Sequence, residues 1–217
     1  MTAGRTPRLP QIPPVLEPAD AALDDGARLV EVRLEDLAAP ELSVRALELE
    51  RVRMARCELD GGRWTRPSIT DAELERCSLS GVLLRDAVVT RVAFADCRLA
   101  GITWAEATLE DVTFRDCRLD LAGFRHARLQ RVAFEDCVLR EADFAEVRAR
   151  DVRFERCDLT GAGFAGARFD GSELRRCTLE EIGGVEGLRG AALEWAGIVG
   201  LAGTLAGALG IEVLDDD

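Results

Sequence analysis

The amino-acid sequence predicts an all-β fold, a parallel β-helix with four sides per coil, followed by a C-terminal α-helix. Two observations predict the β-helix. Seven cysteines recur at intervals of 20 residues, and a leucine follows each of them two positions later. Within each interval a large apolar residue recurs every five residues, with a small or β-branched residue two positions before it. A fixed period of this length is typical of architectures in which successive repeats stack on one another.

The five-residue frame runs without a slip from Leu47 to Glu181, and all eight phenylalanines lie at the centres of its pentads. A period of five matches neither the 3.6 residues of a helical turn nor the two of a flat strand. Each pentad is therefore expected to be a short extended piece followed by a turn, and four pentads make one coil. Residues 20 apart then stack at the inter-strand spacing of roughly 4.8 Å.

The stacking model predicts an aromatic ladder on one side of the coil, at a spacing suited to offset stacking. Its members are Phe94, Phe114, Phe134 and Phe154. A second side places two tryptophans in the same way, at Trp64 and Trp104, and continues with Phe124 and further phenylalanines. These side chains are expected to form the core.

The cysteine column runs from Cys57 to Cys177 and invites metal or redox hypotheses. A zinc site needs ligands that converge tetrahedrally, whereas these side chains point in parallel, and His126 is the one histidine available. Disulfides between coils need Cβ atoms about 3.5–4.5 Å apart, slightly less than the stack offers. We therefore expect small buried hydrophobes, with no metal and no cofactor.

The pentads resemble those of the pentapeptide-repeat family, whose pattern is A(D/N)LXX with Leu or Phe at the centre. The run Ala142-Asp143-Phe144-Ala145-Glu146 shows this pattern, and the resemblance covers about two thirds of the chain. The resemblance implies a right-handed quadrilateral β-helix, with the central residues and their small predecessors pointing inward. The unbroken frame is similar to that of the mycobacterial and actinobacterial members, which lack projecting loops.

Three segments are expected along the chain. Residues 1–26 are predicted to be a flexible lead, because their prolines exclude a regular helix and they contain no apolar run typical of a secretory signal. Residues 27–186 are the β-helix. Residues 187–217 are a capping or dimerisation helix with an acidic tail. Seven cysteines without an export signal indicate free thiols in the cytoplasm.

The C-terminal segment 188–211 is rich in Leu, Ala and Gly, with apolar residues at helical spacing. A membrane anchor is one alternative, because no charge occurs from Trp195 to Ile211, but this stretch is short and holds five glycines. We favour a helix that covers the end of the coil or pairs with a second copy. The segment resembles the C-terminal ends of bacterial quinolone-resistance pentapeptide proteins, which implies a homodimer. The candidate contacts are Trp195, Ile198, Leu201, Leu205 and Leu209.

Charged residues also fall in columns of period 20. One column alternates in sign and predicts a surface ladder of ion pairs: Arg51, Asp71, Arg91, Asp111, Arg131 and Asp151. Two others are acidic and hold the candidate partner-binding residues: Asp96, Asp116 and Asp136 in one, and Asp86, Glu106 and Glu146 in the other. Stacked like charges about 5 Å apart in water cost roughly 1 kcal/mol, so a binding role is one interpretation. The alternative is that Arg115, Arg125 and Arg140 neutralise them.

The net charge of −12 argues against binding nucleic acid through its phosphates. By the family resemblance, the expected function is instead that of a DNA mimic, which binds DNA gyrase or a related type II topoisomerase. The alternative is an interaction scaffold with an unrelated partner, favoured by the near balance of 27 acidic and 22 basic residues over 47–186. An enzyme is not expected: the chain has one histidine, no tyrosine, no phosphate-binding glycine loop and no nucleophile beside a base.

Overall fold

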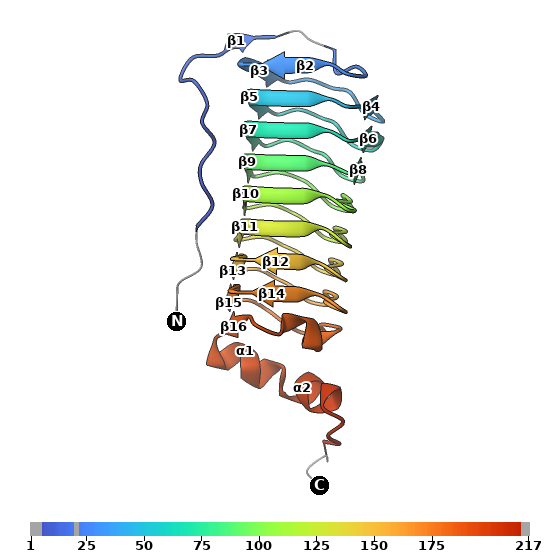
Figure 1. Cartoon of the computed structure of the whole chain (residues 1–217), viewed down its shortest axis with the longest axis vertical. Coiled ribbons are helices and arrows are strands. Elements are labelled where there is room, and N and C mark those ends of the chain that lie inside the picture. Colours follow the sequence, from blue (N-terminus) through green and yellow to red (C-terminus); the bar gives the residue numbers. More distant parts are fainter. Residues whose placement is uncertain (1–5, 20–21, 214–217) are drawn as a thin grey trace.

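The computed structural model describes residues 6–19 and 22–213, and it shows a rod of stacked parallel coils (Figure 1). The N-terminal segment lies alongside the coils, and two short helices lie at the C-terminal end of the rod. The strands are β1 (Glu17–Pro18), β2 (Arg28–Val30), β3 (Val32–Glu35), β4 (Ser43–Arg45), β5 (Glu48–Ala55), β6 (Arg63–Thr65), β7 (Ser68–Glu75), β8 (Leu83–Arg85), β9 (Val88–Ala95), β10 (Thr108–Arg115), β11 (Arg128–Glu135), β12 (Arg148–Arg150), β13 (Arg153–Glu155), β14 (Arg168–Asp170), β15 (Glu173–Arg175) and β16 (Ala192–Leu193). The helices are η1 (Val185–Leu188), α1 (Trp195–Gly200) and α2 (Ala202–Ala208).

The pairing register follows the 20-residue period. Within the body, Phe94 pairs with Phe114 and Phe114 with Phe134, all in parallel strands. Thirteen strands form one sheet that covers two sides of the coil, and β4, β6 and β8 form a second sheet on a third side. Isolated parallel bridges such as Glu58–Ser78 connect successive coils along the fourth side. The predicted parallel, four-sided β-helix is therefore confirmed.

Each corner of the coil is a residue in the left-handed conformation. Among the described residues, 25 that are not glycine have φ between 51° and 61°, and all are spaced by multiples of five from Glu31 to Glu181. This conformation is uncommon for residues other than glycine. The N–H of the corner residue donates to a carbonyl oxygen of the next coil: Asp96 to Arg115 and Asp116 to Glu135, both at 3.0 Å. The stacking of coils thus supports a backbone conformation that one isolated pentad would not favour.

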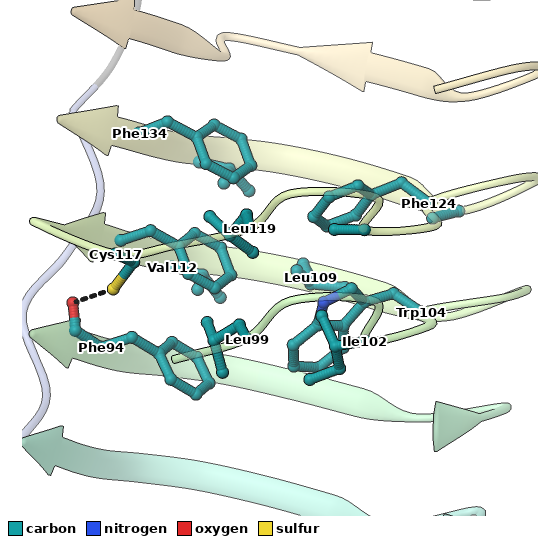
Figure 2. Close-up of a cluster of buried hydrophobic side chains, with 14 of the residues drawn as sticks. Phe94, Leu99, Ile102, Trp104, Leu109, Val112, Cys117, Leu119, Phe124 and Phe134 are labelled. Atoms are coloured by element: carbon teal, nitrogen blue, oxygen red, sulfur yellow. Dashed lines mark hydrogen bonds between the residues drawn. The ribbon is translucent and has the colours of Figure 1, made fainter. Parts of the chain in front are cut away.

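The core consists of two aromatic ladders that meet edge to face (Figure 2). In the first, the ring centroids of Phe94, Phe114 and Phe134 are 4.9 Å apart, and the planes differ by 4° to 8°. In the second, the Trp104 and Phe124 rings stack at 6.4 Å. Phe124 meets Phe134 at an angle of 85°, the T-shaped geometry that aromatic pairs favour. The predicted phenylalanine ladder is confirmed, and the tight packing between ladders fixes the distance between the two sides.

The cysteine column contributes packing and weak hydrogen bonds. Each thiol points to a carbonyl oxygen of the preceding coil, as Cys117 Sγ does to Phe94 O at 3.7 Å (Figure 2). The seven thiols are free, and all but Cys177 are buried. The neighbouring thiol of Cys117 and burial raise the pKa of Cys97 above its ordinary value.

The C-terminal segment differs from the single helix predicted over 188–211. The chain forms η1, the short strand β16, and then the two helices α1 and α2, which meet at Leu201. Three glycines, Gly197, Gly200 and Gly203, lower the helix propensity here by about 1 kcal/mol each. Leu201 itself is only 2% exposed and packs against the end of the hydrophobic core. The helix is interrupted where this side chain turns inward to cover the last coil.

The N-terminal residues 6–19 lie along the outside of the rod, running opposite to the direction in which the coils are added (Figure 1). Strand β1 pairs with β3, and Leu16 is buried. Flexibility of residues 1–26 in solution stays a prediction, and residues 1–5 and 20–21 lie outside the described part. In the structure, residues 6–19 are in contact with the body.

Stability measurements on two substitutions test the ladder geometry. The indole N–H groups of Trp64 and Trp104 are buried without a hydrogen-bond partner among the described residues, which costs about 1–3 kcal/mol each. Trp104→Phe removes one such donor but leaves a small cavity, so the two effects on stability oppose each other. We expect it to change the free energy of unfolding in denaturant titrations by less than about 1 kcal/mol. Phe114→Ala should cost about 3–5 kcal/mol. Equal losses for the two variants would contradict this account.

Candidate functional site

The first acidic edge of the rod consists of Asp96, Asp116 and Asp136. All three are corner residues with φ of 52° to 54°, and all three are exposed. Strands β9, β10 and β11 end one residue before them, so the stacked strands place the three carboxylates one above the other. The edge is a row of like charges held on a rigid backbone.

Arginines neutralise only one end of the first acidic edge. Arg156, the next residue of the same column, binds Asp136 through two hydrogen bonds of 2.7 Å and lowers its pKa. Within residues 6–19 and 22–213, no ion pair involves Asp96 or Asp116. These two carboxylates are therefore the uncompensated part of the edge.

The arginines suspected of neutralising this edge pair with other acids. Arg115 Nε lies 3.8 Å from a carboxylate oxygen of Glu135, and Arg125 Nε lies 3.2 Å from Asp143. Arg140 Nε lies 2.6 Å from Asp158. The hypothesis that these three side chains compensate the acidic columns is not supported by their contacts. The residue 20 positions after Asp136 in the same column is Arg156, and this arginine does neutralise Asp136.

The second acidic edge consists of Asp86, Glu106 and Glu146, which are likewise exposed corner residues. His126 interrupts the row between Glu106 and Glu146. Its Nδ1 lies 3.2 Å from a carboxylate oxygen of Glu146. Among the described residues, Asp86 and Glu106 take part in no ion pair. The second edge therefore also carries two uncompensated carboxylates.

The two acidic edges lie on opposite corners of the coil. Successive corners are five residues apart, so Asp86 and Asp96 are separated by half a coil. Asp86 and Asp96 lie in one coil, and Glu106 and Asp116 lie in the next. The six predicted contact residues are thus brought together as two parallel rows, not as one patch.

The column of alternating sign lies on the corner between the two acidic edges. Arg51 pairs with Glu31 and not with Asp71, and among the described residues Asp151 takes part in no ion pair. Two of the predicted ion pairs are present: Arg91 binds Asp71 through two hydrogen bonds of 2.7 Å, and Arg131 Nε lies 2.6 Å from Asp111 Oδ1. They were expected to be exposed, but Asp71, Asp111 and Arg131 are buried. The N-terminal segment covers this edge, which sequence analysis did not anticipate.

The end of the rod presents apolar side chains to solvent. Of the five predicted dimerisation residues, Trp195 and Leu209 are 79% and 76% exposed, and Ile198 and Leu205 are half-buried. Leu201 is buried against its own chain. Val199 and Ile211, which sequence analysis did not single out, are also exposed. The exposed set forms an apolar surface at the C-terminal end.

Among the described residues, no three His, Cys, Asp or Glu side chains are grouped as metal ligands would be. None of the helices in this part of the chain is long and apolar enough to cross a lipid bilayer. The features that stand out are therefore surfaces: two acidic edges, one covered edge and one apolar end.

Three solved structures with a similar fold are distant from this chain in sequence. QnrB1, a plasmid-mediated fluoroquinolone resistance protein, is 18% identical with a TM-score of 0.34, over 85% of this chain and 100% of that one. HetL, involved in heterocyst differentiation regulation in the cyanobacterium Nostoc sp. strain PCC 7120, is 15% identical with a TM-score of 0.32, over 78% of this chain and 90% of that one. A thylakoid-lumen pentapeptide repeat protein of Arabidopsis thaliana is 22% identical with a TM-score of 0.25, over 45% of this chain and 61% of that one.

No curated protein sequence matches the chain. The family profile described as pentapeptide repeat region matches residues 47–124 and 111–183, which together span most of the coiled body. The matched residues contain the aromatic ladders and both acidic edges. The chain therefore belongs to the pentapeptide-repeat family.

Proposed function

We propose that this protein is a non-enzymatic, cytoplasmic DNA mimic that binds DNA gyrase or a related type II topoisomerase and modulates it or protects it from inhibitors. The observation that carries the proposal is the pair of acidic edges, in which Asp96 and Asp116 on one side and Asp86 and Glu106 on the other have no ion-pair partner among the described residues. A surface under no functional demand would avoid stacking like charges.

The charge spacing of the two edges approaches that of a nucleic acid. In the two coils from Asp86 to Asp116 each edge presents one carboxylate per coil, a rise of roughly 4.8 Å, so the two edges together present one charge per roughly 2.4 Å there. Duplex DNA carries one charge per about 1.7 Å of its axis. A protein surface that binds the two phosphate rows of a duplex neutralises them with Lys and Arg side chains, which two parallel rows of carboxylates would also attract.

An interaction scaffold with an unrelated protein partner is the second candidate. It is favoured by the arginines that flank the acidic edges, since Arg115 and Arg125 each pair with a neighbouring acid and give the faces a mixed charge. A mixed surface of this kind suits a specific protein partner better than a general substitute for DNA. The two candidates differ in whether topoisomerase activity responds to the protein.

Charge neutralisation of the edges tests the proposal in a supercoiling assay with purified DNA gyrase, with and without a fluoroquinolone. We expect the unaltered protein to inhibit supercoiling or to reduce the effect of the drug, more strongly at low salt because the contacts are between charges. Asp96→Asn with Asp116→Asn should weaken the effect about tenfold, and Asp86→Asn with Glu106→Gln should weaken it similarly. Asn is suited to the left-handed corner, so the coil should stay intact.

The matched control is Glu141→Gln with Glu181→Gln. These two acids are also exposed corner residues with positive φ, but they lie on the fourth edge of the coil. The control removes the same amount of charge and should leave the effect unchanged. An equal loss in all three variants would show that bulk charge alone acts. No effect of the unaltered protein on gyrase would favour the unrelated scaffold.

We further propose that the protein is a homodimer through the apolar C-terminal end, where Trp195 and Leu209 are exposed and Leu201 and Leu205 pack against the core. Light scattering should give twice the chain mass of 23.6 kDa. Trp195→Asp with Leu209→Asp should reduce it to the mass of one chain. Leu121→Asp, which changes a 62% exposed leucine on the side of the rod, should not. A monomeric unaltered protein would contradict this assignment.

A further inference from the structure

The N-terminal residues 6–19, hereafter the strap, follow the edge between the two acidic edges (Figure 1). The backbone N–H of Gln11 donates to Asp71 Oδ1 at 2.9 Å. The backbone N–H of Arg8 donates to Asp111 Oδ1 at 3.1 Å, and its Nε donates to Asp111 Oδ2 at 2.7 Å. Arg8 Nη2 also donates to Glu110 Oε1 at 3.3 Å. The two backbone N–H groups of the strap therefore bind column carboxylates that are two coils apart.

The carboxylates that receive the strap are buried and held in place by the body. The Asp111 side chain is fully buried, whereas the Arg8 side chain is 60% exposed. Burial alone opposes ionisation of Asp111, but hydrogen bonds from Arg131 and Arg8 outweigh it and lower its pKa to about 2. Since this pKa is depressed, the contacts are complete at neutral pH and are lost only in strong acid. Arg91 and Arg131 orient the acids from one side, and the strap binds the other side.

The repeat of the strap matches the repeat of the edge. Pro7, Pro10 and Pro13 are half-buried and Leu16 is buried, so every third residue of the strap faces the rod. A polyproline II segment has three residues per turn and rises about 3.1 Å per residue, or about 9.3 Å per turn. Two coils span about 9.6 Å at the usual inter-strand spacing. One turn of such a strap therefore meets one Asp–Arg pair of the edge.

Pro14, the next strap residue in this three-residue register, shows that the backbone N–H is the group that binds the edge. Pro14 follows Gln11 by three residues and has no N–H to donate. The column residue two coils before Asp71 is Glu31, which accepts a hydrogen bond of 2.7 Å from Arg51 of the body, as Asp71 does from Arg91, but accepts none from residues 6–19. The edge binds the strap only where the strap offers a backbone donor.

Residues 6–19 are held on the edge by few polar contacts. The side chains of Leu9 and Val15 are 75% and 79% exposed. Beyond Thr6 the same column continues with Asp151, which lines a hollow of about 170 Å³ together with Arg153 and strap residues Pro7 and Leu9. The edge thus has the chemistry of a peptide-binding track, and its column continues to Asp151, two coils past the last carboxylate that residues 6–19 bind.

We infer that this edge, centred on Asp71 and Asp111, is a docking track for extended proline-rich segments of a partner protein. Such a segment has prolines every third residue, each followed by a residue with a free N–H, and an arginine at one of these positions. The strap is the resident ligand of the track and must be displaced before a partner binds. This site is separate from the two acidic edges, so it stands whether or not the protein binds a topoisomerase.

The test uses the full chain and a labelled synthetic peptide of residues 6–19. In a strap-released variant, Arg8→Glu with Gln11→Pro, the peptide should bind in fluorescence anisotropy. It should bind the unaltered chain at least tenfold more weakly, because the tethered strap competes at high effective concentration. Adding Asp111→Asn to the strap-released variant should weaken peptide binding at least tenfold. Circular dichroism identifies variants that keep the fold.

Two altered peptides separate hydrogen bonding from charge attraction. Gln11→Pro removes the N–H that binds Asp71, whereas Val15→Pro adds a proline at a position whose side chain is 79% exposed. The first should weaken binding at least tenfold and the second should change it less than twofold. The inference is overturned if the peptide fails to bind the folded strap-released variant, if both chains bind it equally, or if the two altered peptides lose equally.

Discussion

The left-handed residue at every fifth position is the constraint on which the rest of this structure depends. A chain that turns through a right angle after each short extended piece needs a corner residue. Here the corner residues have φ near 54°, in the arginine Arg56 as in the aspartates Asp96 and Asp136. Such conformations are disfavoured for most side chains. They persist because corner N–H groups such as those of Arg56, Asp96 and Asp136 donate to carbonyl oxygens of the next coil, so that the stacking of coils offsets the local strain.

The same constraint decides where chemistry can occur. A corner residue directs its side chain outward, and its equivalents 20 residues away lie directly above and below it. Any charge placed at a corner therefore becomes part of a row. Rows of alternating sign, such as Asp71 and Arg91, form ion pairs. Rows of like sign, such as Asp96 and Asp116, leave carboxylates without partners in the described part of the chain. The fold itself converts a periodic sequence into straight lines of charge on a rigid rod.

Periodicity in the sequence predicts the coil, the ladder from Phe94 to Phe154 and the stacking of charged columns, because each of these depends only on residues 20 apart. It does not predict features that break the period. The strap contacts Asp71 and Asp111 from 60 and 103 residues away, and its prolines indicate an extended segment without indicating which edge it follows. The interruption of the C-terminal helix at Leu201 depends on where the last coil leaves its core uncovered. The ion pair between Asp136 and Arg156 could have been predicted, because the two residues are 20 apart in the sequence. The pairing of Arg115 with Glu135 could not, because it depends on the side-chain rotamer of Arg115.

Competition with DNA is the most direct test of the claim that the acidic edges substitute for a duplex. Labelled duplex DNA bound to purified gyrase should be displaced when the protein is titrated in, and the concentration needed should rise with salt, as expected for competition between polyanions. A stable complex that contains gyrase, labelled DNA and the protein together, with no loss of DNA at saturating protein, would contradict the account.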